Sequence, residues 1–359
     1  MRVDHIWLTD FRSYTQAEVR FAPGLTAVVG ANGEGKTNLV EAVVFLATLG
    51  SFRGAPTDAL VRVGASSAVV RAEGERDGRS LLIEAEIGPT GRTRAQVNKQ
   101  RLARTRDLLG ALRATVFAPD DLDMVKGGPA GRRRYLDDLL VAVHPRHDRT
   151  RSDLDRVLRQ RNALLKQCHG RLDADAAATL DVWDERLAAT ATEWGHARRD
   201  LVARLAPVLG AAYDEVASES AAVDVDYTPD WLDAGMAGVL AEGRRDDVRR
   251  GLTLVGPHRD EVGLSIAGMP ARTHASQGEQ RSLTFALRIA GHDLVSTEVG
   301  TSPILVLDDV FSELDPGRSH ALLTALPAGQ TILTTASGLP EGAAPEQIVD
   351  IEGGEIRPR

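Results

Sequence analysis

The chain has 359 residues, of which 43% are hydrophobic, and it carries a formal net charge of −8. This length allows two domains, and the hydrophobic content excludes a disordered chain. The single cysteine excludes a disulfide framework, and the sequence shows neither a signal peptide nor an apolar run of the roughly 18 residues that cross a membrane. We therefore expect a cytoplasmic protein with no membrane partner, in which nucleic acid could bind only at a local basic surface.

The first predicted elements are a strand, a glycine-rich loop and a helix in direct succession. Residues 25–29 form an apolar run typical of a buried strand, and residues 38–46 have helical character. The loop between them matches the phosphate-binding pattern G-x-x-x-x-G-K-[ST]. Its expected nucleotide contacts are Gly30, Ala31, Asn32, Gly33, Glu34, Gly35, Lys36, Thr37 and Asn38.

The chemistry of this P-loop follows from its backbone and two side chains. Backbone N–H groups and the positive end of the following helix close around phosphate oxygens. Lys36 is expected to reach the β- and γ-phosphates, and Thr37 to hold Mg²⁺ through its hydroxyl. The motif therefore predicts nucleotide binding with Mg²⁺.

A basic segment lies between residues 92 and 106 and contains no acidic residue. Its candidate DNA contacts are Arg92, Arg94, Lys99, Arg101, Arg104 and Arg106. No aromatic residue is interleaved, so contacts to a duplex backbone fit better than stacking on single strands. The alternative is a solvated hairpin that binds nothing. A second cluster, residues 132–134, could contact DNA, or could instead brace the helical arm or the nucleotide.

The middle of the chain is predicted to be helical. Apolar residues recur at helical spacing in residues 152–167 and again in residues 174–216, with Gly170 as a helix stop between them. We expect two antiparallel helices whose Trp and Leu stripe is core rather than a binding face. The predicted domains are a head with two lobes, formed by residues 1–117 and 253–359, and a mostly helical arm, residues 118–252.

Two motifs in the C-terminal part supply the rest of a nucleotide site. Ser276 and Glu279 have the spacing of a capping box, which predicts the start of a helix. Residues 304–310 form an apolar run that contains Asp308 and Asp309 near its end. At the C-terminal end of a buried parallel strand, Asp308 is expected to hold Mg²⁺ with Thr37, and Asp309 to orient the attacking water. Lys36, Asp308 and Asp309 are thus the predicted catalytic residues.

Residues 276–280 resemble the signature motif of ABC-type ATPases, and residues 312–315 resemble their D-loop. The resemblance implies an α/β fold with an ABC-type ATPase head around a P-loop core split in sequence. It also implies that signature and D-loop residues act on ATP bound to a second copy, so that two chains dimerise head to tail around two ATP. The residues concerned are Ser276, Gln277, Gly278, Glu279 and Gln280, with Ser312 and Asp315.

Further stretches narrow the resemblance. Residues 11–14, 117–122, 132–137 and 254–260 together resemble the RecF family, bacterial recombination and repair ATPases related to SMC proteins. The resemblance implies a nucleoid-associated protein that binds ATP, dimerises, and recognises duplex DNA next to single-strand gaps. It implies weak, DNA-stimulated ATP hydrolysis, and work with RecO and RecR to load RecA during DNA replication and repair.

The resemblance also bears on Arg12, which would lie near the nucleotide and could contact a phosphate. The alternative is a surface arginine on an edge strand.

Two other functions are weighed against this one: a transporter ATPase subunit and an SMC-like structural tether. Residues 331–336 lack the switch histidine that transporter ATPases place there, and Asp309 is shorter than the glutamate usual in fast enzymes. The missing histidine argues against a transporter subunit. Both features favour slow hydrolysis, in which ATP acts mainly as a dimerisation switch. The predicted arm is too short for an SMC-type coiled coil, which argues against the tether.

Overall fold

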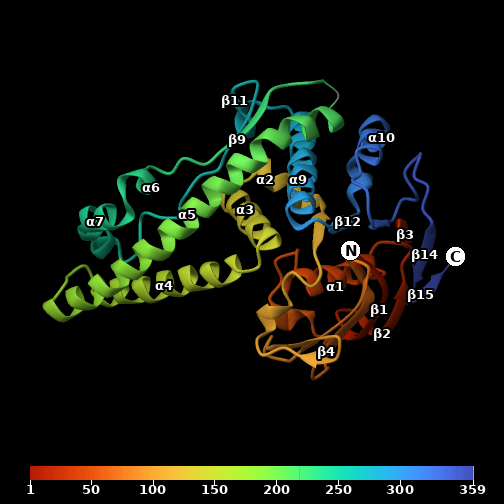
Figure 1. Cartoon of the computed structure of the whole chain (residues 1–359), viewed down its shortest axis with the longest axis horizontal. Helices are drawn as coiled ribbons and strands as arrows, with labels where there is room; N and C mark the ends of the chain where they lie inside the picture. The colour runs from red at the N-terminus through yellow and green to blue at the C-terminus, as the bar shows by residue number, and fades with distance from the viewer. Residues whose placement is uncertain (218, 359) are drawn as a thin grey trace. The chain divides into compact units, whose positions relative to one another are not determined.

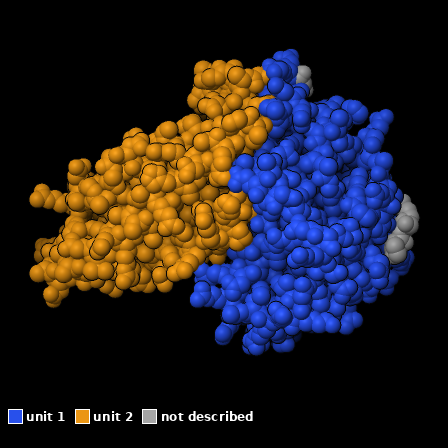
Figure 2. All heavy atoms as spheres, in the orientation of Figure 1, with its two compact units in different colours: residues 1–122, 211–220, 281–359 blue, residues 123–210, 221–280 orange. Residues whose placement is uncertain are grey.

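The computed structural model describes residues 1–217 and 219–358, apart from the side chains of residues 313 and 358. The chain divides into two compact units (Figure 2). Unit 1 comprises residues 1–122, 211–220 and 281–359, and unit 2 comprises residues 123–210 and 221–280. Residues 253–280 thus group with unit 2. The predicted head (residues 1–117 and 253–359) and arm (residues 118–252) were defined by their expected functions rather than by compactness. This domain division stays a prediction.

Within the described residues, unit 1 holds two six-stranded sheets (Figure 1). The first is antiparallel, with the order β2-β1-β4-β5-β6-β7. Its strands are β1 (Arg2–Phe11), β2 (Tyr14–Arg20), β4 (Ala68–Arg76), β5 (Arg79–Ile87), β6 (Thr93–Val97) and β7 (Gln100–Arg101). In β4, Ala68, Val70 and Ala72 are buried while the residues between them are more accessible, as expected for a sheet with one face on the core.

The second sheet of unit 1 has the order β15-β14-β3-β13-β12-β8. Its strands are β3 (Leu25–Val29), β8 (Ala114–Phe117), β12 (Ile304–Asp308), β13 (Thr331–Thr335), β14 (Gln347–Glu352) and β15 (Glu355–Pro358). All neighbouring strands are parallel except the β14–β15 pair. Because the carboxyl ends of parallel strands meet at one edge, the P-loop after β3 and the end of β12 lie at the same edge, with β13 between them.

Helix α1 (Lys36–Thr48) follows the P-loop and is buried along most of its length. Its side chains share one hydrophobic core with residues of both sheets, including Ile6, Val70 and Val306. The remaining helices of unit 1 are α10 (Pro316–Thr324), most of α9 (Gln277–Val299), and the 3₁₀ turns η1 (Thr57–Leu60), η2 (Thr105–Leu108), η3 (Pro119–Leu122) and η4 (Val310–Glu313). The predicted strand at 25–29 and the helix after the P-loop are confirmed.

Unit 2 is mostly helical, with one small sheet of order β11-β10-β9. Its strands are β9 (Val223–Asp226), β10 (Gly263–Ile266) and β11 (Met269–Pro270). Its helices are α2 (Asp123–Lys126), α3 (Pro129–Val143), α4 (His147–Gln167), α6 (Asp230–Ala234), α7 (Met236–Arg250), α8 (Ala271–His274) and most of α5 (Ala174–Val216).

Helices α4 and α5 confirm the predicted antiparallel pair. Thr150 bonds to Glu193 and Arg161 to Asp184, so partners rise along one helix as they fall along the other. The apolar stripe of α5 is core, as predicted: Leu187, Trp194 and Leu201 are almost fully buried. Figure 1 shows the two helices side by side in unit 2.

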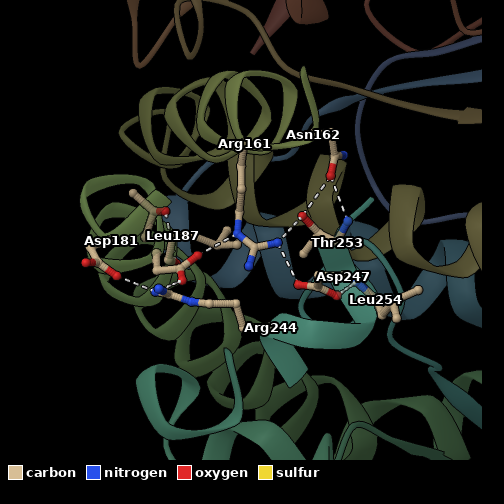
Figure 3. Close-up of polar contacts among 10 residues, drawn as sticks. Arg161, Asn162, Asp181, Leu187, Arg244, Asp247, Thr253 and Leu254 are labelled. Atoms are coloured by element: carbon tan, nitrogen blue, oxygen red, sulfur yellow. Dashed lines mark hydrogen bonds and ion pairs between the residues drawn. The ribbon is translucent and has the colours of Figure 1, made fainter. Parts of the chain in front are cut away.

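A buried ion cluster joins α4, α5 and α7 (Figure 3). The Arg161 side chain is fully buried; its Nε donates to Asp184 at 2.7 Å, and its Nη1 donates to Asp247 at 2.7 Å and to Thr253 at 2.8 Å. Arg244 donates to Asp184 from α7 at 2.6 Å. Burial raises the pKa of the Asp247 carboxyl, and the hydrogen bond from Arg161 opposes that shift. One guanidinium thus satisfies carboxylates from two other helices.

We expect Arg161→Met to destabilise the chain by about 3–5 kcal/mol, because it leaves the buried Asp247 carboxylate without its cation and removes one of the two cations that pair with Asp184. The matched control is Arg159→Met, which removes an exposed arginine from the same helix and should change stability by less than about 0.5 kcal/mol. Urea unfolding followed by circular dichroism measures both. Equal stabilities for the two variants would contradict a structural role for the Arg161 cluster.

Candidate functional site

The conformation of the P-loop depends on two glycines with positive φ angles and on hydrogen bonds from the Lys36 side chain. Gly33 and Gly35 have φ angles of 87° and 107°, a region that side chains disfavour, so the pattern's glycines meet a backbone need. Lys36 is buried, and its Nζ donates to the carbonyl oxygens of Gly30 and Ala31, each at 2.8 Å. The ammonium is therefore held at the mouth of the loop.

A cleft of about 280 Å³ opens beside this loop. The described residues that line it are Asn32, Gly33, Gly35, Lys36, Thr37, Asn38, Arg53 and Asp309. All but Arg53 are residues that the sequence predicts for the nucleotide site. A larger hollow of about 430 Å³ lies in unit 2 around Trp231 and Asp260, but the smaller cleft is the one that carries the P-loop.

Asp308 does not line the cleft itself but joins three elements behind it, through a bond to the lining residue Thr37. Its Oδ1 accepts a hydrogen bond from the Thr37 hydroxyl at 3.0 Å and another from the Thr334 hydroxyl at 2.7 Å. Thr37 belongs to α1 and Thr334 to β13, while Asp308 ends β12. Burial raises the pKa of the Asp308 carboxyl, and the two hydroxyl donors oppose that shift.

The pair formed by Thr37 and Asp308 suits Mg²⁺. Both offer hard oxygen ligands, and Mg²⁺ is usually bound by one or two protein oxygens together with phosphate oxygens and water. Among the residues described, no group of three or more His, Cys, Asp or Glu could hold a metal ion by itself. A Mg²⁺ ion at this pair would therefore depend on the phosphates of a nucleotide.

Asp309 has an unusual environment for a carboxylate. Its φ angle is 51°, in the left-handed region, and its backbone N–H is held by Thr334. Its Oδ1 is buried, with no hydrogen-bond partner within the described part of the chain. Because an unpaired buried acceptor is costly, such an atom in a cleft is a candidate for binding a water molecule.

Arg12 bonds to the P-loop helix but does not line the cleft. Its Nε and Nη2 donate to the Glu41 carboxylate at 2.7 and 2.8 Å, and its Nη1 donates to the Ala59 carbonyl at 3.0 Å. Arg12 lies in the turn between β1 and the edge strand β2, outside both strands, and its side chain is only 17% exposed, so the alternative of a surface arginine on an edge strand is wrong. The predicted phosphate contact of Arg12 stays a prediction.

The capping box at the start of α9 is confirmed. The Ser276 N–H donates to Glu279 Oε2 at 2.7 Å, and the Glu279 N–H donates to Ser276 Oγ at 3.3 Å. Ser276, Gln277 and Glu279 are exposed and Gly278 is half-buried. The Gln280 amide is buried and donates to the Ala271 carbonyl of α8 at 3.2 Å. Gln280 therefore serves the interior of unit 2 in this structure, and the predicted contacts of the signature residues with a second copy stay predictions.

The two D-loop residues hold the chain after β12. Ser312 Oγ donates to the Asp309 carbonyl at 2.8 Å. Asp315 caps α10 by accepting from the Arg318 N–H at 2.9 Å. Both are exposed, and their predicted action on a second copy stays a prediction.

The basic segment forms a hairpin that we call the basic hairpin, residues 92–106, comprising β6, β7 and the first half of η2. All six of its Arg and Lys side chains are exposed. Within the described residues, only Arg94 has an ion-pair contact, with Glu86 at 3.6 Å. The 132–134 cluster differs: Arg132 is buried against Glu261, and Arg133 donates to the Asp260 carbonyl. Two of its three arginines therefore brace unit 2.

Sequence reasoning missed Arg53 and Thr334. Arg53 lines the cleft, and its Nη1 lies 3.4 Å from Asn38 Oδ1. A cation between Gly50 and Gly54, just after the P-loop helix, was the available signal. Thr334 donates to Asp308 and accepts from the Asp309 N–H. In the sequence, only its position in the predicted strand at residues 331–336 indicated that it could lie near the site.

Comparison with known proteins agrees with this geometry. Residues 2–337 match the family described as RecF/RecN/SMC N terminal domain. The DNA replication and repair protein RecF of Streptomyces avermitilis is 45% identical over 351 residues, which are 94% of each chain. The protein of the same name from Kineococcus radiotolerans is 43% identical, over 99% of this chain and 96% of its own. This chain belongs to the RecF family.

Solved structures support the same assignment. The recombination mediator protein RecF in the RecFOR pathway, solved as RecF-ATPrS and as RecF-ATP, matches with TM-scores of 0.91 and 0.90. The identities are 25% and 26%, over 99% of this chain and 98% and 97% of those chains. An SMC head domain from Pyrococcus furiosus, 16% identical over 99% of this chain and 95% of its own, shares the fold with a TM-score of 0.56. The predicted α/β, ABC-type ATPase head is confirmed. No helix in the described ranges is long and apolar enough to cross a membrane.

We expect Lys36→Met to weaken ATP binding by about 10- to 100-fold, because charged hydrogen bonds to phosphate are worth about 1.5–3 kcal/mol. ATP-dependent dimerisation should disappear with it, as measured by analytical ultracentrifugation. Lys166→Met, which removes an exposed lysine of α4, is the control and should dimerise normally. A Lys36→Met chain that still dimerises with ATP would contradict the role of the P-loop.

Proposed function

We propose that this chain is an ATP-dependent DNA-binding protein of recombinational repair and replication. The observation that carries the proposal is one cleft lined by the P-loop and by Asp309, whose Oδ1 is unpaired among the described residues, with Asp308 bonded to the lining residue Thr37. The relatives named DNA replication and repair protein RecF support it. The chain acts in the cytoplasm at the nucleoid, where its substrate lies.

The residues in and beside the cleft have separate roles in the proposed binding and hydrolysis of ATP. The P-loop N–H groups and Lys36 bind the phosphates of ATP, and Thr37 and Asp308 hold Mg²⁺, which neutralises phosphate charge. Asp309 orients the attacking water through its free Oδ1. Its short side chain and the absence of a histidine in residues 331–336 favour slow hydrolysis. ATP then acts mainly as a dimerisation switch, and its weak hydrolysis is stimulated by DNA.

The signature helix completes the site in a second copy. Ser276 and Gln277 are exposed at the N-terminal end of α9, where N–H groups and the helix dipole favour an anion. Two such contacts, related by a two-fold axis, hold two chains head to tail around two ATP. Ser312 and Asp315 belong to the same interface.

The basic hairpin binds duplex DNA next to single-strand gaps. Its six exposed cations, five of them without an ion pair among the described residues, suit phosphates of the duplex backbone. The bound dimer then works with RecR and RecO to load RecA. The solved structures of RecF in the RecFOR pathway support these partners.

We expect Ser276→Arg to leave ATP binding to the monomer intact and to block ATP-dependent dimerisation, because Ser276 does not line the cleft of its own chain and acts on ATP bound to the second copy. Equilibrium binding of a fluorescent ATP analogue and analytical ultracentrifugation measure the two effects separately. Thr273→Arg, which adds the same side chain at an exposed position of α8, is the control. Loss of ATP binding by the Ser276→Arg monomer would overturn the two-chain site.

Replacing Lys99, Arg101 and Arg104 with glutamate should weaken duplex binding at every sequence and lower the salt slope, log Kd against log salt concentration, by about 2 to 3. Fluorescence anisotropy with a gapped duplex, at several salt concentrations with ATP, measures the slope. The control with equal charge change replaces the exposed Arg20, Arg79 and Arg357. If both triple variants lose the same affinity, net charge rather than the basic hairpin governs binding.

A further inference from the structure

The turn between β1 and β2 bonds to the P-loop helix through three consecutive side chains. Arg12 pairs with Glu41, Ser13 Oγ accepts from Asn38 Nδ2 at 2.8 Å, and Tyr14 Oη donates to the Gly35 carbonyl at 3.0 Å. The partners stand three residues apart, so they follow one face of α1. The turn therefore holds the start of this helix at three successive points.

The contact of Tyr14 is the one that reaches the phosphate-binding backbone. Tyr14 is 2% exposed, and burial raises the pKa of its hydroxyl, which stays protonated and donates. A Cβ at Gly35 would lie 2.8 Å from Tyr14 Oη and 3.2 Å from Ser13 Oγ. Gly35 thus needs to be glycine for this approach as well as for its φ angle.

The peptide between Gly35 and Lys36 is fixed by two donors. The Gly35 carbonyl accepts from the Leu39 N–H at 3.0 Å as well as from Tyr14 Oη. A trans peptide is planar, so the Lys36 N–H points opposite to that carbonyl. Lys36 is the first residue of α1, where an N–H has no acceptor within the helix. Gly35 and Lys36 line the cleft, whereas Tyr14 does not.

We propose that Tyr14 and Ser13 are positioning residues for phosphate binding. Tyr14 holds the Gly35 carbonyl away from the cleft, so that the Lys36 N–H is presented to a phosphate oxygen. Ser13 holds the side chain of Asn38, which lines the same cleft. Fixing these groups in advance lowers the entropy lost when a nucleotide binds. The inference rests on the proposed nucleotide-binding function and adds the residues that prepare its backbone.

The test is Tyr14→Phe, which keeps the ring and removes only the hydroxyl. The loss of one hydrogen bond that orients the site should raise the Kd for ATP about three- to tenfold. Tyr227→Phe is the matched control, because Tyr227 is also buried and its hydroxyl donates to a carboxylate, Asp260, in unit 2. Both variants should lower Tm, but Tyr227→Phe should bind ATP with the affinity of the unmodified chain. Isothermal titration calorimetry and thermal unfolding give the two readouts.

Ser13→Ala keeps the test decisive if Tyr14→Phe folds poorly, because Ser13 is exposed. It should weaken ATP binding about two- to threefold with little change in Tm. Unchanged ATP affinity in both variants would overturn the positioning role and leave the turn as packing. An unmodified chain that binds no ATP would instead refute the proposed function itself, so the two failures are distinct.

Discussion

The nucleotide cleft depends on one acceptor atom, Asp308 Oδ1, which receives the hydroxyls of Thr37 and Thr334. These three residues come from α1, β12 and β13, and no two of them are neighbours in sequence. They meet because β13 lies between β3 and β12 in a parallel sheet, whose carboxyl ends share one edge. The strand order therefore brings the P-loop after β3 and the carboxylates after β12 to the same edge of the sheet, with Thr334 of β13 between them.

A second constraint comes from Glu41, a fully buried carboxylate on the P-loop helix. It pairs with Arg12 of the β1–β2 turn and accepts a hydrogen bond from Ser51. Ser51 Oγ also accepts from the Arg53 N–H, and the Arg53 side chain lines the cleft. A buried carboxylate without partners would be strongly destabilising. Glu41 therefore stabilises the positions of the β1–β2 turn and of the segment that contains Ser51. The antiparallel sheet, whose other end carries the basic hairpin, is thereby bonded to the helix that starts at the phosphate site.

The elements and motifs that could be predicted from the sequence are those determined by residues close to one another in the chain. The strand at 25–29, the capping box of Ser276 and Glu279, and the antiparallel pair α4 and α5 each follow from spacing, backbone need or periodicity within a short window. Arg53, Thr334 and the pairing of Arg12 with Glu41 depend on partners brought close only by the tertiary fold. Gln280 shows the same limit, since a motif gives its place on α9 but not that its amide turns toward the carbonyl of Ala271.

The net charge of the chain does not show which of its basic side chains are paired with carboxylates and which are not. The chain is acidic overall, and unit 2 is rich in arginine, yet Arg151, Arg161, Arg198 and Arg244 all pair with aspartates there. The basic hairpin differs because its own window contains no acidic residue to pair with. A polyanion approaching an acidic protein is repelled by most of its surface and attracted where cations stand unpaired. The negative net charge thus does not oppose the proposed duplex contact, because the basic hairpin is a local basic surface on unit 1.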